Sequence, residues 1–272
     1  MSKRNDPDAL DLLVNDVQGS AKYRDISPDL VRTIAAQELT KRRTLKEAVK
    51  ATKNKLHQVS GAYLDPRENY AAWLQELTVA QQSGEPETIK QVCRRIMSHH
   101  ASTRERLSIL DQFYSTLLGE LPPLQSVLDL ACGLNPLAYL CFPYAENITY
   151  YACDIYRPMI DFLNAAMAVM NIKGHAEVRD ILQSCPTQEV DLALVLKTIP
   201  CLEQIDKQAG ARLLRTINAH YMIVSFPAQS LGGRNKGMLT NYEAHFYQLV
   251  EGENWEIRKV EFASELVFLV KK

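Results

Sequence analysis

Three aspartates, Asp129, Asp154 and Asp180, lie at the ends of short apolar segments whose composition is typical of β-strands. If these segments are parallel strands of one sheet, their carboxyl ends meet at the edge where open α/β sheets hold ligands. A carboxylate after the second strand of such a sheet can accept hydrogen bonds from both hydroxyls of a ribose. Aspartate is also a common helix cap or turn residue, so it is the set of three that predicts a nucleoside site.

The loop after the first of these strands has the composition of a ligand-binding turn. It reads Ala-Cys-Gly-Leu-Asn-Pro over residues 131–136, and small residues allow a ligand to approach the backbone. The Asn-Pro pair can begin a helix. Gly133 is its one glycine, whereas a dinucleotide-binding loop carries three, so the loop does not favour NAD.

A cationic residue, Arg106, precedes the first strand and could clamp a ligand carboxylate through two parallel hydrogen bonds. It lies in the segment 98–106, where Ser102 and Glu105 have the spacing of a capping box. This spacing predicts a helix from there to about Leu118. The two adjacent histidines of the segment have no cysteine or carboxylate at ligand spacing, so we expect no metal site.

Lys197 follows the apolar fourth strand, and a basic loop from Ser225 to Met238 follows the fifth. The lysine could face a ligand, or it could be a rim residue whose ammonium reaches solvent. The loop lacks the Gly-Lys-Ser/Thr ending of a Walker motif. It is interpreted as a lid or an RNA-contacting loop, with an idle surface turn as the alternative.

From Ser126 onward, strands and helices alternate, which predicts a mainly parallel α/β sheet. The last two β-rich segments are separated by two residues and predict an antiparallel hairpin. The expected strands are 126–130, 148–153, 175–178, 190–196, 221–226, 255–262 and 265–270, and the main helices are 156–170 and 207–219.

Before the sheet, residues from about Asp8 to Leu118 show helical periodicity. Helix boundaries are expected at Ser27-Pro28, Gly61, Asp65-Pro66 and 83–86. The sequence therefore predicts two domains, an all-helical one over residues 1–100 and a sheet domain over residues 101–272.

Positive charge is concentrated in the helical part of the chain. Eleven Lys or Arg and five Asp or Glu residues lie between Lys22 and Arg67, in a chain whose net charge is −1. Within it, the segment 41–60 predicts an amphipathic helix, with Leu45, Val49, Leu56 and Val59 on one face and Arg42, Lys46, Lys50 and Lys53 on the neighbouring one. This face is either an ordinary solvated surface or a patch for a phosphate backbone.

Composition excludes several classes of protein. The chain has 46% hydrophobic and 23% charged residues, as expected of a globular protein. No apolar stretch approaches the roughly 20 residues that span a bilayer. The six cysteines lack disulfide-type spacing and no apolar signal segment is visible, so we expect a cytoplasmic protein.

Several short motifs, in this order, closely resemble those of the aminoglycoside-resistance 16S ribosomal RNA methyltransferases, which methylate N7 of guanine 1405 in the decoding site. The resemblance extends over nearly the whole chain and implies a Rossmann-like class I methyltransferase sheet, with an antiparallel last strand, behind an N-terminal all-helical domain. The matching segments are Lys22-Tyr23, Pro28 to Arg32, Leu56-His57, Gly61-Ala62-Tyr63, His100 to Arg106, Asp129 to Pro136, Cys153-Asp154, Ser225 to Pro227, Gly232 to Arg234 and Gly237-Met238.

The resemblance also implies the cofactor, S-adenosyl-L-methionine, and the residues around it. Arg106 would hold the methionine carboxylate, Ala131 and Gly133 would line its path, and Asp154 would bind the ribose. The remaining cofactor residues would be Ile155, Asp180, Ile181 and Leu182, the last three around the adenine. Lys197, Ser225, Phe226 and Pro227 would position the reactants.

By the same resemblance, the partner would be 16S rRNA in the assembled 30S subunit, with no membrane or metal, and the protein would act as a monomer. Methylation would confer resistance to gentamicin and kanamycin. The expected RNA contacts are Lys22, Arg42, Lys46, Lys50, Lys53 and Arg67 in the helical domain, with Arg234 and Met238 nearer the target base.

Guanine N7 has a free lone pair and no proton at neutral pH, so its methylation needs no general base. We expect catalysis by alignment of N7, methyl and sulfur. Because N7 lies in the narrow major groove of A-form RNA, the guanine is expected to be flipped into the pocket. The alternatives are a methyltransferase for another decoding-site position, such as an adenine N1, and a non-catalytic ribosome-binding relative.

Overall fold

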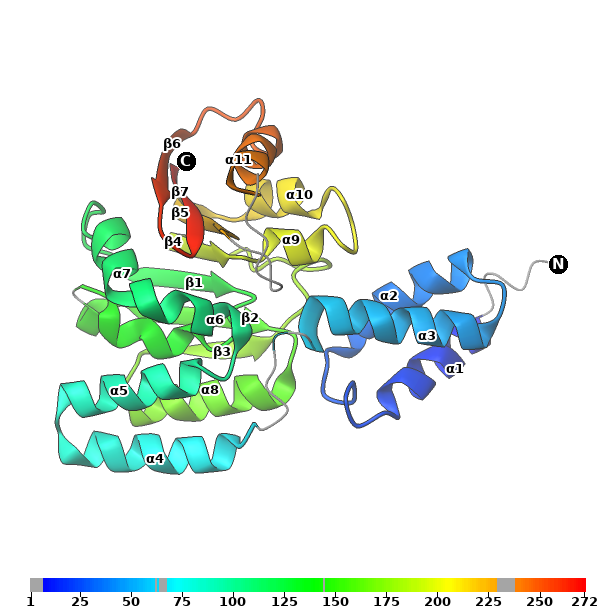
Figure 1. Ribbon diagram of the computed structural model, residues 1–272, viewed down its shortest axis with the longest axis horizontal. Coiled ribbons are helices and arrows are strands. Elements are labelled where there is room, and N and C mark those ends of the chain that lie inside the picture. Colours follow the sequence, from blue (N-terminus) through cyan, green and yellow to red (C-terminus); the bar gives the residue numbers. More distant parts are fainter. Residues whose placement is uncertain (1–6, 62, 64–67, 144, 229–237) are drawn as a thin grey trace.

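The computed structural model describes residues 7–61, 63, 68–143, 145–228 and 238–272. At its centre is a seven-stranded sheet with the strand order β3-β2-β1-β4-β5-β7-β6 (Figure 1). The first five strands are parallel, and β7 pairs antiparallel with both β5 and β6. The predicted fold is therefore confirmed. The strands are β1 Ser126–Leu130, β2 Thr149–Asp154, β3 Gly174–Val178, β4 Val190–Leu196, β5 Ala219–Pro227, β6 Glu256–Glu261 and β7 Glu265–Lys271.

Helices cover both faces of this sheet, which is why its central strands are continuously apolar. Both layers are visible in Figure 1. One face carries α4 Tyr70–Ser83, α5 Pro86–Met97, α6 Ala101–Arg106, α7 Leu110–Leu118 and α8 Arg157–Val169. The other carries α9 Ile199–Leu202, α10 Ala209–Thr216 and α11 Met238–Leu249. Short 3-10 turns, η3 Leu107–Ile109, η4 Asn135–Cys141 and η5 Ala145–Asn147, complete the sheet unit.

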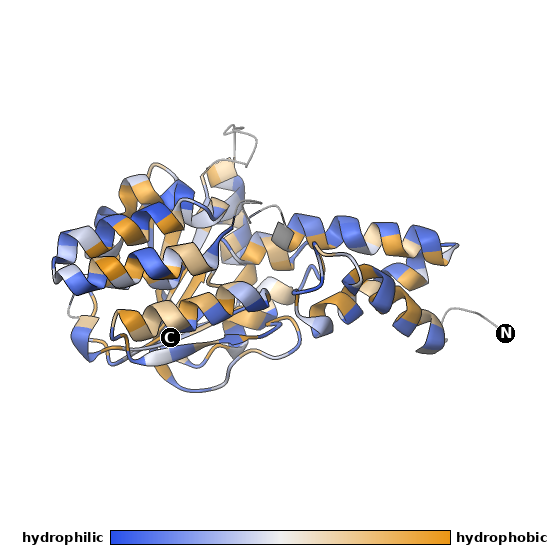
Figure 2. Ribbon diagram, turned by 90° about the horizontal axis from the view of Figure 1, so that it is seen from below, coloured by the Kyte–Doolittle hydropathy of each residue, from blue (hydrophilic) through white to orange (hydrophobic). Residues whose placement is uncertain are grey.

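The first three helices form a separate body that projects from the sheet (Figures 1 and 2). They are α1 Pro7–Gln18, α2 Pro28–Lys41 and α3 Leu45–Leu56, and α3 continues into a π-helical turn, η2 His57–Gly61. Their buried apolar residues, among them Leu13, Val17, Ile34 and Leu56, form a core of their own. We call these residues, 7–61, the N-terminal unit.

Helices α4 and α5 pack on the sheet and not on the N-terminal unit. Trp73, Leu77 and Ile96 share one buried cluster with Phe113 and Phe162 on the sheet's own helices. The apolar stripes of α4 and α5 therefore complete the sheet's core, although both helices precede residue 100.

Two helix starts differ from those expected. The amphipathic segment begins at Leu45, not near residue 41, because Thr44 forms a capping box with Glu47. Leu45, expected on the buried face, is 40% exposed as a result. Arg42 lies before the helix, where it pairs with Glu38 of α2.

The capping box expected from Ser102 and Glu105 is also wrong. Helix α6 begins two residues earlier, with His100 and not Ser102 at its N-cap. The Glu105 carboxylate instead pairs with Lys197, so it is not available to cap the helix. The 3-10 turn η3 then separates α6 from α7.

None of the helices in the described part of the chain is long and apolar enough to cross a membrane.

Candidate functional site

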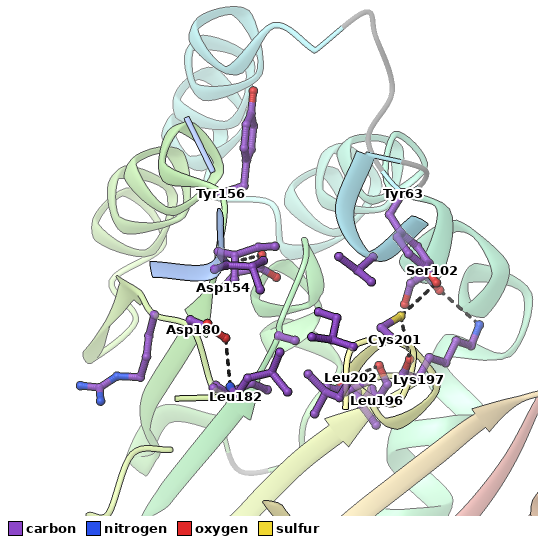
Figure 3. A pocket seen from close by; sticks show the side chains of 18 of the residues that line it. Tyr63, Ser102, Asp154, Tyr156, Asp180, Leu182, Leu196, Lys197, Cys201 and Leu202 are labelled. Atoms are coloured by element: carbon purple, nitrogen blue, oxygen red, sulfur yellow. Dashed lines mark hydrogen bonds between the residues drawn. The ribbon is translucent and has the colours of Figure 1, made fainter. Parts of the chain in front are cut away.

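A pocket opens at the carboxyl ends of β1, β2 and β4, beside the point where the strand order reverses between β1 and β4 (Figure 3). This is the place where open α/β sheets bind ligands. In the view of Figure 3, Asp154 and Asp180 lie on one side of the pocket and Tyr63, Cys201 and Lys197 on the other. The two sides differ in chemistry.

Asp154, the last residue of β2, holds the loop of β1 in place. Its Oδ2 accepts a hydrogen bond from the backbone N–H of Gly133 at 2.9 Å, and its Oδ1 accepts one from Ile155 N–H at 2.6 Å. Burial raises the pKa of this carboxyl, and the backbone N–H groups oppose the rise. A carboxylate has about four lone-pair sites, and the backbone N–H groups of Gly133, Ile155 and Tyr156 use up to three of them, so at least one stays free for a hydroxyl donor.

Asp180 gives the same side of the pocket a second acceptor. Its Oδ1 accepts a hydrogen bond from Leu182 N–H at 3.0 Å, whereas its buried Oδ2 has no partner among the described residues. Burial raises the pKa of Asp180. Ile155, Ile181 and Leu182 supply apolar lining beside the two carboxylates. Acceptors beside apolar walls suit a ribose joined to a flat heterocycle.

The loop between β1 and η4 has an unusual backbone. Ala131 and Gly133 both have left-handed conformations, with φ of +53° and +52°. A Cβ at Gly133 would lie 2.6 Å from Cε1 of His100, so no other residue fits without moving that ring. Lys197, directly after β4, has φ of +58°. Strained residues at the ends of the two strands flanking the pocket are typical of functional sites.

His100 lines the other side of the pocket, a role that its sequence context did not predict. Its ring stacks on Tyr63, with centroids 6.0 Å apart, and its buried Nδ1 has no partner among the described residues. Burial and the nearby Arg106 lower the pKa of His100 to about 4. At neutral pH it is an uncharged imidazole, and its ring forms part of the pocket wall.

Lys197 is buried and ion-paired, which decides between the two interpretations of its sequence position. Its Nζ lies 2.7 Å from Glu105 Oε2 and 3.3 Å from Glu265 Oε1, and it donates to the carbonyl of Ser102 at 3.4 Å. The side chain is therefore a fixed cation at the pocket wall, not a solvent-facing rim lysine.

Arg106 is fully buried and does not line the pocket. Its Nε and Nη2 form a two-pronged ion pair with Glu265 of β7, at 2.8 and 3.0 Å, and its Nη1 donates to Asn135 Oδ1 at 3.1 Å. The carboxylate that it clamps is thus one of the protein's own. One N–H on each of Nη1 and Nη2 is left for a further acceptor.

The end of β5 lies behind Lys197 and not in the pocket. Ser225 accepts two hydrogen bonds from the backbone N–H of Lys197, at its carbonyl and at its Oγ. The next residue, Phe226, is fully buried and stacks on Tyr242 of α11, with centroids 5.0 Å apart. Pro227 ends the strand. These three residues support the backbone on which Lys197 stands.

The expected RNA-contacting cations of α3 fall into two groups. Lys46 and Lys50 are exposed, and among the described residues no carboxylate lies within ion-pair distance of either. Lys50 lines a groove between α2 and α3 together with Arg42. Arg42, however, is held by the buried carboxylate of Glu38 at 2.8 Å.

Lys53 and Lys22 are engaged within the N-terminal unit. Lys53 Nζ lies 2.8 Å from Asp16 Oδ1, and Lys22 Nζ lies 3.1 Å from Nδ1 of His57. Among the expected cations that the structure describes, Lys22, Lys46 and Lys50 have no carboxylate within ion-pair distance, and Lys22 is held by His57 instead.

The two arginines expected nearest the RNA, Arg67 and Arg234, lie outside the described residues. Met238 begins α11 and is partly exposed. In the part of the chain that the structure describes, no three His, Cys, Asp or Glu side chains form a group that could hold a metal ion.

Two further wall residues come from the N-terminal unit, Leu30 of α2 and Val59 of η2. Nearby, the Tyr63 hydroxyl lies 3.0 Å from the sulfur of Cys201, a contact between Tyr63 and helix α9. No local pattern marks Leu30 or Val59 as site residues, because their periodicity is that of any helix core.

Comparisons with known proteins agree with this geometry. Residues 19–269 match the model of a family described as ribosomal RNA methyltransferase (FmrO). A protein of Frankia casuarinae named 16S rRNA (guanine(1405)-N(7))-methyltransferase is 38% identical over 97% of this chain and 94% of its own length. A Serratia marcescens protein of the same name is 36% identical over 94% and 96%. The crystal structure of the 16S rRNA methyltransferase RmtF in complex with S-adenosyl-L-homocysteine superposes with a TM-score of 0.79, at 31% identity, over 100% of this chain and 99% of that one.

Proposed function

Because the chain belongs to the FmrO family of ribosomal RNA methyltransferases, we propose that it methylates N7 of guanine 1405 in 16S rRNA, with S-adenosyl-L-methionine as the methyl donor. The observation that supports this most directly is the pocket between β1, β2 and β4, where two carboxylates with free acceptor sites stand beside apolar walls.

The residues of the pocket fit this cofactor. Asp154 would accept a ribose hydroxyl at its remaining acceptor capacity, and Asp180, with Ile181 and Leu182, would surround the adenine. Ile155, Ala131 and Gly133 would form the floor between the adenosine and the methionine. This set corresponds to the cofactor residues that the resemblance implied, except that Arg106 is paired with Glu265. Asp129, the third aspartate of the sequence pattern, is buried against Asn135 and Tyr150 and does not line the pocket.

The methionine end of the cofactor needs partners for a carboxylate and an ammonium group. His100 Nδ1 is the unpartnered polar atom on that side of the pocket, and Lys197 is the nearby fixed cation. Arg106 would reach the carboxylate only with its two remaining N–H groups, because Glu265 occupies the others. We therefore propose that His100 and Ser102 share the role that the sequence alone assigned to Arg106.

When bound, S-adenosyl-L-methionine supplies an electrophilic methyl group on a sulfonium. The protein's task is then positioning, since N7 carries no proton to remove. The left-handed backbone at Ala131 and Lys197 fixes the two strand ends that flank the site, and Ser225 anchors Lys197 from behind. Such alignment of reactants supplies roughly 7–11 kcal/mol in well-oriented systems. A neutral His100 also avoids placing another positive charge beside a cationic cofactor.

The N-terminal unit is proposed to dock on the rRNA. The exposed, unpaired Lys46 and Lys50 would contact phosphates, and the partner would be the assembled 30S subunit. We place the boundary between the docking unit and the methyltransferase unit between residues 61 and 70, since α4 and α5 pack on the sheet. A monomer in the cytoplasm, and resistance to gentamicin and kanamycin, belong to the same proposal.

The activity is tested by transfer of labelled methyl from S-adenosyl-L-methionine to purified 30S subunits, followed by mapping of the modified base. We expect modification at N7 of guanine 1405, and expression in a susceptible bacterium should protect against gentamicin and kanamycin but not apramycin. Modification at an adenine N1 would instead support the alternative decoding-site enzyme. Absence of methyl transfer would instead support the other alternative, a non-catalytic ribosome-binding protein.

The docking surface is tested by Lys46→Ala with Lys50→Ala, measured as 30S affinity over a series of salt concentrations. Loss of two phosphate contacts should lower the salt slope by about 1.5 to 2 and weaken binding. Lys173→Ala, an exposed lysine at the start of β3 on the sheet unit, is the matched control. An unchanged affinity and slope in the double variant would remove α3 from the docking surface.

A further inference from the structure

The cofactor pocket is built from both units of the chain. Leu30 of α2 and Val59 of η2 line it together with Ile155, Tyr156 and Ile205 of the sheet unit. Resting on the proposed function, we propose that bound cofactor fixes the N-terminal unit against the sheet, so that cofactor and rRNA bind cooperatively. The pocket is then both a donor site and the joint that orients the docking surface.

A backbone bridge makes the first connection between the two units. Ile26 pairs with Tyr156 as an isolated antiparallel bridge. Ser27 N–H donates to the carbonyl of Ile155 at 2.7 Å, and Arg157 N–H donates to the carbonyl of Asp25 at 3.0 Å. The bridge thus joins the start of α2 to the two residues that follow Asp154.

Among the described residues, two side chains make further polar connections between the units. Gln183 Nε2 donates to the carbonyl of Asp29 at 3.0 Å and also contacts Thr33 Oγ1, both on α2. Lys55 Nζ donates to the carbonyl of Gln204 at 3.1 Å. On the sheet side, each connection is at or next to a pocket-lining residue. The joint between the units and the wall of the pocket are therefore one place.

A ligand that fills this pocket contacts both units and so binds best when they are closed on one another. Each unit has its own buried core. The units meet through these hydrogen bonds, which water can replace, and through apolar contacts with the N-terminal core, made by the pocket-lining residues Ile155, Tyr156, Leu182 and Ile205. A ligand with higher affinity for the closed arrangement shifts the population toward it. Linkage then requires rRNA to raise cofactor affinity by the same factor by which cofactor raises rRNA affinity.

The docking surface is connected to the pocket through one continuous helical segment. Helix α3 runs directly into η2, so Lys46 and Lys50 lie on the same rigid body as Val59. In Figures 1 and 2 this body projects beyond the sheet unit. An angular change at Val59 would therefore displace the lysines, and fixing Val59 against bound cofactor would hold them in one orientation relative to the active site.

The first test needs no RNA. Amide hydrogen exchange is measured on the full chain with and without saturating S-adenosyl-L-homocysteine. We expect slower exchange at Ser27 and Arg157, whose N–H groups form the bridge, and along residues 28–33 of α2. Exchange in α1, far from the joint, is the internal control for stability. Unchanged exchange at Ser27 and Arg157 would overturn the inference.

The second test measures the affinity of the protein for 30S subunits with and without saturating S-adenosyl-L-homocysteine. We expect saturating S-adenosyl-L-homocysteine to raise the affinity by a factor of about five or more, which is the lower range of measured couplings. This factor is the affinity ratio used below. Val59→Ala removes a wall contact from a half-buried position and should bring the ratio toward one. Gln183→Ala loosens the joint without touching the pocket, so it should lower cofactor-free affinity most and raise the ratio.

Gln112→Ala, an exposed glutamine on α7, is the matched control and should leave the ratio unchanged. A ratio of one in the wild-type protein, or one that Val59→Ala and Gln183→Ala do not move in opposite directions, contradicts the coupling. Methyl transfer to 30S subunits is followed in parallel. If transfer occurs while the ratio is one, the coupling alone fails, and if no transfer occurs, the proposed function fails while the exchange experiment still tests the joint.

Discussion

Replacement of Asp154 by asparagine tests the assignment of the adenosine side of the pocket. The wild-type carboxylate accepts from Gly133 N–H and Ile155 N–H, lies close to Tyr156 N–H, and retains at least one free acceptor site. Asparagine keeps the shape but turns one oxygen into an NH₂ group, which cannot accept. One backbone N–H then faces another donor, and at least one of the bonds available to a ribose is lost along with the charge.

The size of the effect follows from these bonds. A hydrogen bond to a charged acceptor contributes roughly 1.5–3 kcal/mol. Loss of one such bond to the ligand should therefore raise the Kd for S-adenosyl-L-homocysteine by about 10- to 150-fold. Isothermal titration calorimetry measures this Kd directly, and urea unfolding of the same samples reports whether the variant is folded.

Asp191 supplies a matched control near the amino end of the central strand β4, at the end of the strands away from the pocket. Its Oδ2 accepts from the backbone N–H groups of Gln125 and Ser126 at 2.7 and 2.9 Å, which is the same local chemistry without a pocket. Asp191→Asn should lower stability and leave cofactor affinity unchanged. An Asp154→Asn protein that is stably folded and binds with wild-type affinity would refute the assignment.

Three further predictions concern stability and the loop. Gly133→Ala must move the His100 ring or the backbone, so calorimetry should show weakened cofactor binding, whereas Gly84→Ala, with similar φ and open space, should cost only about 1 kcal/mol of stability. Glu265→Gln leaves its two buried cationic partners without a shared carboxylate and should cost about 3–5 kcal/mol in urea unfolding. His100 is neutral in the folded protein, with its pKa lowered to about 4, while the unfolded histidine takes up a proton near pH 6.5. Proton uptake by the unfolded histidine should therefore lower the free energy of unfolding by up to about 3 kcal/mol as pH falls from 6.5 to 4. Burial raises the pKa of Asp129 to about 7, so Asp129 changes the stability in the opposite direction over this pH range. The prediction is therefore checked by comparing the pH dependence of the unfolding free energy between wild type and His100→Asn. An unchanged pH profile in the variant would contradict it.

The sheet and the meeting of Asp154 and Asp180 at one pocket could be predicted from the sequence because their signals are local. Buried parallel strands are apolar along their whole length, and β4, Val190–Leu196, was predicted to the residue. Asp154 and Asp180 follow such strands, and strand direction alone brings their side chains to the same edge. The left-handed backbone at Gly133 likewise has a local cause, because glycine adopts a positive φ at little steric cost.

Only the tertiary structure decided which distant groups meet. Arg106 was expected to clamp a ligand, but Glu265 lies 159 positions further along the chain and reaches it through the antiparallel β5–β7 pairing. A helix stripe does not reveal what it packs on, so α4 and α5 could not be assigned to the sheet, nor Leu30 and Val59 to the pocket. Sequence periodicity determines which face of an element is buried, whereas the partner of that face depends on how the whole chain closes around it. The composition of the strands and loops thus determined a mainly parallel sheet with a nucleoside-type pocket at its carboxyl edge. The packing of the N-terminal unit against this sheet decided that residues of both units line the pocket.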